Sequence, residues 1–228
     1  MQIKLKIHAL LRPNNKIDFL RSLNSTANIL DVGCGNNSPY LTKKILPQCH
    51  YVGLDISDHN QTRLNKSDIY IVTTPENFNQ EIFKFEEEFD AVISAHNLEH
   101  CNDREETLLA MMKSLKISGK LYLSFPSPET LKMPSRKGTL NYLDDSTHIG
   151  CPPDYYDILK KLTQNDFQII FSKKNYRPKI LGLIGRILEP LSITKNKVMT
   201  GTWEYYGFES IIIAQKIIAY SLTNPNIR

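Results

Sequence analysis

The sequence predicts an α/β fold in which a mostly parallel β-sheet is covered by helices on both faces. Short apolar runs alternate with longer segments of helical periodicity, and the first apolar run ends in a glycine-rich turn. Strands that are apolar along their whole length are typical of parallel sheets, because both faces of such a sheet are buried. The length of 228 residues, of which 41% are hydrophobic, suits a single domain with its own core.

The candidate strands are short, apolar and rich in β-branched residues. They span residues 28–32, 50–55, 68–73, 89–95, 119–125, 167–172 and 208–216. Helical spacing of apolar residues, together with cap signals, predicts helices between most of them. These helices span residues 39–46, 60–66, 76–85, 103–116 and 153–164. The clearest is 103–116, in which Leu108, Met112 and Leu115 share one face and a Ser-Gly pair follows as the stop.

One long segment, residues 175–206, breaks this alternation and carries the only tryptophan, Trp203. Its apolar residues recur with helical spacing, which predicts a helix packed on the domain. That face consists of Ile180, Leu181, Ile184, Ile187, Leu188 and Leu191. A lid over a substrate and a helix lying on a membrane surface are the alternatives.

The charge balance is mildly basic, with 28 Lys and Arg against 24 Asp and Glu. The basic residues are spread along the chain, which argues against a nucleic-acid partner. A weak basic cluster at 173–179 fits a solvated rim, with an acidic substrate group as the alternative. The four cysteines form no CxxC pair, the N-terminus is too polar for a signal peptide, and no run is long enough to span a membrane. We therefore expect a cytoplasmic protein.

The turn after the first strand contains the strongest functional signal. Asp31 lies at the end of that strand and is followed by Gly33 and Gly35, so a ligand could approach the backbone closely and meet the free N–H groups of the next helix. Asp55 ends the second strand, 20 residues after Gly35, where a carboxylate can accept both hydroxyls of a ribose. Up to this point a dinucleotide fits equally well.

Two details favour an adenosine ligand without phosphates. A dinucleotide fingerprint needs a third glycine where this chain has Ser38. Asp31 would repel a pyrophosphate, whereas it would attract the sulfonium and ammonium groups of S-adenosylmethionine. These residues therefore predict S-adenosylmethionine as the cofactor, with its methionine part facing Asp31.

Four runs resemble, in order and spacing, the motifs of class I S-adenosylmethionine-dependent methyltransferases. They are "ILDVGCG", "YVGLDIS", "FDAVISAHNLEH" and "LKISGKLYLSFPSP", and the resemblance covers residues 28–125 well and extends loosely to 216. It implies a Rossmann-like fold with a seven-stranded, mostly parallel sheet whose last strand is antiparallel. It also implies contacts to the cofactor from residues at the ends of the first four strands. These are Asp31, Gly33 and Gly35 at the methionine end, Asp55 and Ile56 at the ribose and adenine, Glu76 and Asn77 near the adenine amino group, and His96 and Asn97 at the border of the cofactor.

The expected organisation is a single methyltransferase domain over residues 1–228. A helical extension, 1–25, precedes a cofactor-binding core, 26–174. An insert at 175–206, expected to be a lid or substrate wall, leads into the last strand at 207–218.

The run "HNLEH", 96–100, allows two interpretations. His96, Glu99 and His100 would share one helical face, a spacing that can ligate a metal. A similar run in quinone-biosynthesis O-methyltransferases is linked to a divalent ion. The same Leu-Glu-His run recurs across the superfamily without a metal, where it orders the turn after the strand. We expect this second duty, with no metal, and with His96 at the cofactor and as a catalytic candidate.

The loop after the fifth strand is the better catalytic candidate. It brings Asp144, Asp145, His148 and Tyr155 together ahead of a helix. His148 could take the proton of an acceptor hydroxyl during methyl transfer. A histidine that fixes the loop onto the next helix is the alternative.

The leading hypothesis is a methyltransferase that methylates oxygen on a small polar molecule, such as a sugar, a glycan precursor or a phosphorylated metabolite. A methyltransferase-like binding protein without turnover is the second hypothesis, although it would not need Asp31, Gly33, Gly35 and Asp55. A nicotinamide-dependent dehydrogenase is the third, and Ser38 and Asp31 disfavour it.

Overall fold

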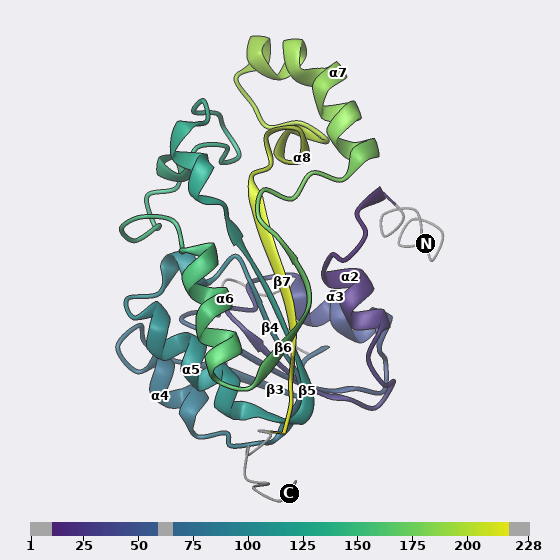
Figure 1. The fold of residues 1–228 in the computed structure, drawn as a ribbon, viewed down its shortest axis with the longest axis vertical. Helices are drawn as coiled ribbons and strands as arrows, with labels where there is room; N and C mark the ends of the chain where they lie inside the picture. The colour runs from purple at the N-terminus through teal and green to yellow at the C-terminus, as the bar shows by residue number, and fades with distance from the viewer. Residues whose placement is uncertain (1–10, 59–65, 219–228) are drawn as a thin grey trace, which may run out of the picture.

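The computed structural model describes residues 11–58 and 66–218. Its centre is one sheet with the strand order β3-β2-β1-β4-β5-β7-β6 (Figure 1). The strands are β1 (Asn28–Val32), β2 (His50–Asp55), β3 (Ile69–Val72), β4 (Phe89–Ala95), β5 (Leu115–Pro126), β6 (Phe167–Lys173) and β7 (Glu209–Lys216). Neighbouring strands are parallel except for β7, which runs antiparallel to both β5 and β6. The predicted fold class is confirmed, including the antiparallel last strand.

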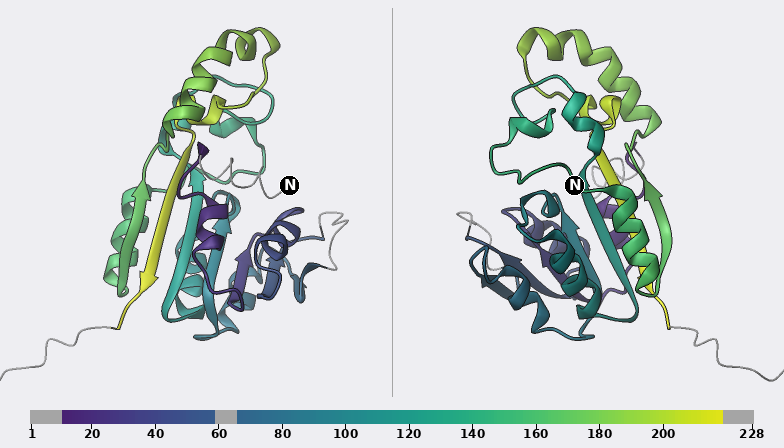
Figure 2. Two further views of the ribbon diagram at one scale, coloured as in Figure 1. Left: turned by 90° about the vertical axis from the view of Figure 1, so that its right-hand side faces the viewer. Right: turned by 60° about the vertical axis from the view of Figure 1, so that its left-hand side comes forward.

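Helices cover both faces of this sheet (Figures 1 and 2). They are α2 (Lys16–Arg21), α3 (Ser38–Ile45), α4 (Phe78–Phe83), α5 (Arg104–Ser114), α6 (Tyr155–Gln164), α7 (Lys179–Lys195) and α8 (Thr202–Tyr206), with short 3-10 turns η2 (Leu98–His100), η3 (Pro128–Lys132) and η4 (Tyr142–Asp144). Helices α4, α5 and α6 lie on one face, and α2 and α3 lie on the other. Helices α7 and α8 form a cap beyond the sheet, at the edge where the parallel strands end.

Each face of the sheet has its own hydrophobic core, because side chains alternate along a strand. In β1, Leu30 and Val32 join the core under α4, α5 and α6, whereas Ile29 joins the core under α2 and α3. All three side chains are fully buried. The central strands are thereby fixed on both sides, and their carboxyl ends are held at defined positions.

The predicted strands agree with the observed ones to within one residue at each end, except at β5, which begins at Leu115 rather than at residue 119. The preceding helix was predicted to run to 116, but α5 ends at Ser114. The chain is already extended at Leu115, which pairs with Phe89 of β4, and it bends at Ser118, whose φ is 68°. The predicted helix at 60–66 and the first ten residues of the predicted N-terminal extension lie outside the described residues, apart from residue 66.

The predicted apolar face of α7 is only partly the packing surface, because Leu181 is buried and Ile184 and Leu188 are half-buried, but the other predicted residues are exposed. The buried residues of this helix are Leu181, Gly185, Glu189 and Ser192, whereas Ile180 and Ile187 are 50% and 68% exposed. Gly185 lies so close to α8 that a Cβ atom there would be 1.9 Å from the carbonyl oxygen of Gly201. Close backbone contact and a buried ion pair between Glu189 and Arg136 therefore decide which side of α7 is buried. Within the described ranges, no helix combines the length and the apolar character needed to cross a bilayer.

Candidate active site

The carboxyl ends of β1, β2 and β4 open into a cavity of about 730 Å³, a size typical of small-molecule sites. In an open parallel sheet this edge is where ligands bind, because the loops after neighbouring strands diverge there. The cavity is lined by Gly33, Gly35, Asp55, Ile56, Pro75, Glu76, Phe78, Asn79, His96, Asn97, His100, Cys101, Asn102, Asp103, Glu106, Thr107, Thr147 and Ile149.

The two glycines of the first turn serve different purposes, although both have positive φ values, 70° at Gly33 and 56° at Gly35. A Cβ atom at Gly33 would lie 2.2 Å from Oδ1 of Asn97, so this glycine is needed for packing within the protein. A Cβ atom at Gly35 would meet no atom within 4 Å, so it would project into open space. Gly35 is therefore the position at which a side chain would take up room that a ligand needs.

Asp55 holds this turn in place from the end of β2. Its side chain is buried, and its two carboxylate oxygens accept hydrogen bonds from the backbone N–H groups of Gly35, at 2.7 Å, and Ile56, at 2.8 Å. Ile56 is 45% exposed and lies on the cavity wall beside Asp55. A carboxylate and an exposed apolar side chain thus stand next to each other, which suits a ribose and its attached base.

Asp31 is not among the described residues that line the cavity. It lies deeper, where Oδ2 accepts hydrogen bonds from Lys16 Nζ at 2.8 Å, from Tyr51 Oη at 2.9 Å and from the hydroxyl of Ser38. Its other oxygen, Oδ1, is buried without a hydrogen-bond partner. The negative charge that was expected to attract a cationic ligand is thus already paired with a lysine from α2, a residue that sequence reasoning missed.

The two residues expected near the adenine amino group are placed differently. Glu76 lines the cavity, whereas Asn77 is exposed at the N-cap of α4 and is not among the described lining residues. Asn79, which the sequence analysis did not single out, also lines the cavity.

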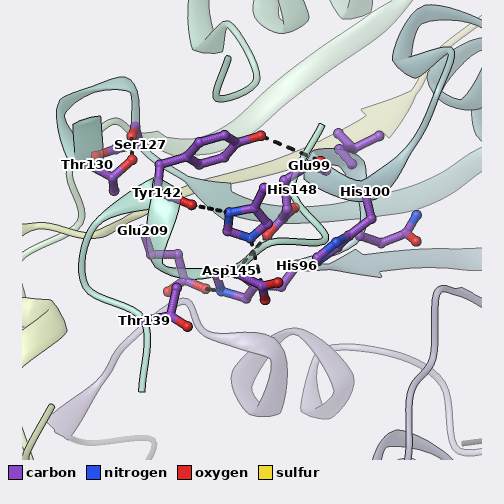
Figure 3. Close-up of polar contacts among 12 residues, drawn as sticks. His96, Glu99, His100, Ser127, Thr130, Thr139, Tyr142, Asp145, His148 and Glu209 are labelled. Carbon is purple, nitrogen blue, oxygen red and sulfur yellow. Dashed lines mark hydrogen bonds and ion pairs between the residues drawn. The ribbon is translucent and has the colours of Figure 1, made fainter. Parts of the chain in front are cut away.

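His96 is held at the end of β4 between two carboxylates. Its Nδ1 lies 3.1 Å from Glu99 Oε1, and its Nε2 lies 3.0 Å from Glu209 Oε1 on β7 (Figure 3). Burial alone would lower the pKa of His96, but the hydrogen bonds to Glu209 and Glu99 raise it to about 10. The ring is therefore protonated at neutral pH, and both nitrogens donate. His96 lines the cavity, but a histidine in this state cannot accept a proton from a substrate.

The N-terminal segment reinforces this charged cluster. Arg12 forms ion pairs with Glu209 and, at 3.1 Å, with Glu204 of α8. Burial would raise the pKa of Glu209, but Arg12 and His96 lower it. The charges of Arg12 and His96 thus balance those of the buried carboxylates, and they join the N-terminal segment to the cap and the sheet.

The opposite wall of the cavity is built by the loop between η4 and α6. This loop folds over η2, where Ile149 N–H donates to the carbonyl of Glu99 at 2.9 Å. Arg104 fixes it further by donating to the carbonyls of Leu98, at 2.9 Å, and Cys151, at 2.5 Å. Loop residues distant in sequence are thereby brought against the end of β4.

His148 lies just behind this wall, with a side chain only 5% exposed. Its ring stacks on Tyr142 with 4.3 Å between centroids, and Nδ1 donates to the carbonyl of Tyr142 at 2.6 Å (Figure 3). Of the two carboxylates expected beside it, only Asp145 is near, with Oδ2 3.9 Å from Nε2. Asp144 instead accepts backbone N–H groups, among them those of Arg136 and Leu140, so it stabilises the preceding turn.

The comparisons with known proteins agree with this architecture. A family model described as "Methyltransferase domain" matches residues 6–170. The chain belongs to this family, the S-adenosylmethionine-dependent methyltransferases of class I, whose methyl donor is S-adenosylmethionine.

Similar proteins were found both by sequence and by structure. An uncharacterized protein of Methanocaldococcus jannaschii is 34% identical over 103 residues, which are 42% of this chain and 27% of that protein, so the chain matches only about a quarter of its relative. An S-adenosylmethionine-dependent methyltransferase from Mesorhizobium loti has a TM-score of 0.59 at 16% identity, covering 88% of this chain and 97% of that one. A putative methyltransferase from Haloferax volcanii, in complex with the Trm112 methyltransferase activator, has a TM-score of 0.63 at 12% identity, with 94% of each chain covered. These structural likenesses support the fold.

Proposed function

We propose that this protein transfers the methyl group of S-adenosylmethionine to an oxygen atom of a small polar acceptor. The observation that carries the proposal is a single cavity with two unlike walls. One wall, with Gly35, Asp55 and Ile56, suits an adenosine ligand. The other ends in His100 and Thr147, with His148 directly behind, and offers groups that can remove a proton.

The residues of the first wall fit the cofactor. The open space at Gly35 leaves room for a ligand against the backbone, and the carboxylate of Asp55, which can accept hydrogen bonds from ribose hydroxyls, lies on the cavity wall beside the apolar surface of Ile56. Gly33, His96 and Asn97 would border the cofactor, and Glu76 and Asn77 would lie toward the base. Asp31 would act on the methionine end through the turn that follows it. When bound, S-adenosylmethionine supplies a methyl group on a sulfonium, which leaves as a thioether when a nucleophile takes the methyl.

The residues of the second wall deal with the acceptor. A hydroxyl that gains a methyl group must lose its proton, and His148 is the candidate base because the hydrogen on Nδ1 is held by Tyr142, which leaves Nε2 as the basic nitrogen. The positive charge of His96 is paired with Glu99 and Glu209, so the removal of a proton from a hydroxyl carries the assignment of the acceptor class. This supports sugars, glycan precursors and phosphorylated metabolites as the acceptor class, and does not call for a nucleic acid.

The insert at 175–206 would cover the acceptor side. The cap formed by α7 and α8 stands over the edge of the sheet at which the cavity opens. The ring of Trp203 in α8 lies against the ring of His96, with 5.4 Å between the ring centroids. A cap in this position would exclude water from the transfer and keep acceptor and donor aligned. The cytoplasm, where S-adenosylmethionine and such acceptors occur together, is the expected location.

A binding protein without turnover is the second candidate. Two observations favour a binding protein: His96 is a cation held by two carboxylates, and the side chain of His148 is buried. Neither group is therefore free in the cavity to take a proton. Such a protein would bind S-adenosylmethionine and its demethylated product but would release no methylated acceptor.

The test combines calorimetry with an acceptor screen. Purified protein should bind S-adenosylmethionine and be inhibited by S-adenosylhomocysteine, and mass spectrometry of reactions with sugars, nucleotide sugars and hydroxylated metabolites should detect a gain of one methyl group. Absence of cofactor binding would refute the proposal. Binding without methyl transfer to any acceptor would favour the second candidate, and a rise in melting temperature with a nicotinamide dinucleotide would favour a dehydrogenase.

A further inference from the structure

Three side chains with metal-binding atoms meet behind the acceptor wall of the cavity. Glu99 and His100 belong to η2, and His148 comes from the loop that folds over it. One ligand atom of each lies within 4.8 Å of the ligand atoms of the other two. Figure 3 shows the three side chains grouped together beside Tyr142. A cation placed among them would be reached by all three after small side-chain rotations.

The hydrogen bonds of the two histidines leave the same nitrogen available on each ring. Nδ1 of His148 lies 2.6 Å from the carbonyl oxygen of Tyr142, and Nδ1 of His100 lies 3.2 Å from the carbonyl oxygen of Thr147. Because a carbonyl oxygen only accepts, the proton of each neutral ring belongs on Nδ1. Each Nε2 therefore carries a lone pair. An imidazole held by a carbonyl through one nitrogen while the other binds metal is the usual arrangement in metalloproteins.

Glu99 supplies an independent sign of a missing partner. Its side chain is 1% exposed, and Oε1 is occupied by His96. Its second oxygen, Oε2, is buried and has no hydrogen-bond partner among the described residues. A buried carboxylate oxygen without a partner is costly, since that oxygen has lost its hydrogen bonds to water and gained none within the protein. A cation at this oxygen would remove that cost.

His96 does not belong to this group, although the spacing of "HNLEH" includes it. Both of its ring nitrogens are engaged, one by Glu99 Oε1 at 3.1 Å and the other by Glu209 Oε1 at 3.0 Å. Neither nitrogen is therefore open to a metal ion. The fold thus replaces His96 with His148, a residue far along the chain that no local spacing connects to η2.

We propose that Glu99, His100 and His148 bind a divalent transition-metal ion beside the methyl-transfer cavity. Two imidazoles and one carboxylate suit zinc, manganese or iron(II) better than calcium or magnesium, which prefer all-oxygen sites. Asp145, 3.9 Å from Nε2 of His148, is the nearby carboxylate that could complete the coordination or compete for the histidine. Of the three proposed ligands, His100 also lines the cavity, so the site adjoins it.

Such an ion would bind the acceptor oxygen and lower the pKa of its hydroxyl, so that the proton passes to water while the oxygen takes the methyl group and the sulfonium becomes a thioether. This role rests on the proposed function, whereas the binding of the ion does not. With the ion bound, His148 would act as its ligand; without the ion, His148 would be the base of the proposed function.

The experiment measures metal binding directly. Protein freed of metal with a chelator is titrated with Zn²⁺ and Mn²⁺ by calorimetry, and with Co²⁺ while the visible absorption of the bound ion is recorded. Wild type should bind one ion per chain. His100→Gln and Glu99→Gln should each weaken binding at least tenfold, since loss of a supporting group alone costs about 10–100-fold. His148→Gln should do the same, and His50→Gln, at a half-exposed histidine on β2, should bind as wild type.

Two controls keep the outcomes separate. Thermal unfolding identifies a variant that fails to fold. His100→Gln is the most informative variant because His100 is partly exposed and its ring packs on His148 alone, whereas the ring of His148 packs on both His100 and Tyr142. S-adenosylmethionine binding is measured on the same samples, so a failure of the cofactor assignment is recognised independently. The metal site would be overturned if wild type bound no metal, or if the His100 and Glu99 variants bound it as tightly as wild type. Chelator-resistant methyl transfer by a protein that does bind the ion would overturn its role in the reaction.

Discussion

The two walls of the cavity are built in different ways. The cofactor wall comes from one stretch of chain, in which Gly35 and Asp55 are joined by a single hydrogen bond from backbone to carboxylate. The acceptor wall joins η2 to a loop almost fifty residues further on, through Arg104, Tyr142 and Ile149. In the proposed function, the first wall would recognise its ligand mainly with backbone and one carboxylate, and the second with side chains held by distant partners. A cofactor shared by a whole family needs only the first kind, whereas an individual acceptor needs the second.

The sharpest way to break this comparison is to fill the space at Gly35. Gly35→Val should abolish measurable S-adenosylmethionine binding, because its side chain would project into the cavity. Calorimetry measures the affinity. Gly150→Val is the matched control, since Gly150 has a similar φ of 61° and no atom within 4 Å of its Cβ position, but lies in the loop and does not line the cavity. Equal affinities of both variants would mean that Gly35 does not face the ligand.

The second change acts on the other wall. His148→Ala should lower the rate of methyl transfer by roughly 10²–10⁴, the contribution expected of a positioned proton-transfer group. Cofactor affinity should stay within twofold, because His148 belongs to the acceptor side. A wild-type rate would remove His148 from the reaction and leave the alignment of donor and acceptor as the source of catalysis.

A change at Asp55 should have a smaller but selective effect. Asp55→Ala removes charge-assisted hydrogen bonds worth about 1.5–3 kcal/mol each, so cofactor affinity should fall at least tenfold. The backbone N–H of Gly35 also loses its acceptor, which loosens the turn. Asp90→Ala is the control, because Asp90 lies at the amino end of β4, away from the cavity, and pairs with Lys116. This variant should leave the affinity unchanged in the same calorimetric assay. Unaltered affinity for the Asp55 variant would refute its role at the ribose.

The cap offers a change that should affect turnover and spare the cofactor. Gly185→Ala places a methyl group against the backbone of Gly201, and overpacking of this kind costs about 1–3 kcal/mol. We expect a lower melting temperature and slower methyl transfer with unchanged cofactor affinity. Gly182→Ala is the matched control on the same helix, because its Cβ would find ordinary contact at 3.6 Å. Full turnover in a variant whose cap has loosened would show that the insert does not cover the acceptor.

The smallest expected effect concerns the pH dependence of stability. The pKa of His96 is raised to about 10, so its contribution is complete below its ordinary value of about 6.5 and is lost as the pH rises through about 10. The melting temperature of wild type should therefore fall between pH 7 and 10. His96→Gln should be less stable at pH 7 but show a flatter decline. Parallel curves for the two proteins would mean that His96 is not protonated in the native state.

Several residues predicted to bind the cofactor lie close together along the chain. The end of a strand at Asp55 and the two glycines before it follow from local composition, and in the fold Gly33, Gly35 and Asp55 line the same cavity. The sequence does not reveal that Lys16 neutralises Asp31, or that Glu209 faces His96, because these partners come from other elements and leave no local pattern. A histidine in "HNLEH" looks the same whether it is free or held by a strand that comes 113 residues later.

The failure at α7 has a different cause. Hydrophobic periodicity assumes that apolar surface decides which side of a helix is buried. Gly185 of α7 and Gly201 allow the two backbones to approach closely. The pair of Glu189 and Arg136 is buried, with hydrogen bonds of 2.6 and 2.9 Å. Small residues and a satisfied ion pair outweigh the apolar stripe, and neither signal is visible until both partners are known.

The position of β7 has a consequence for biosynthesis. It is the last described strand along the chain, yet it lies between β5 and β6 and delivers Glu209 to His96. A ribosome releases the chain from the N-terminus, so β5 and β6 are both complete while the strand that must join them is still inside the exit tunnel. During that interval both have an unpaired edge of the kind that promotes aggregation. Insertion of β7 closes those edges and completes the charged cluster at His96 in one event, so a chain interrupted before residue 209 would be both inactive and prone to aggregate.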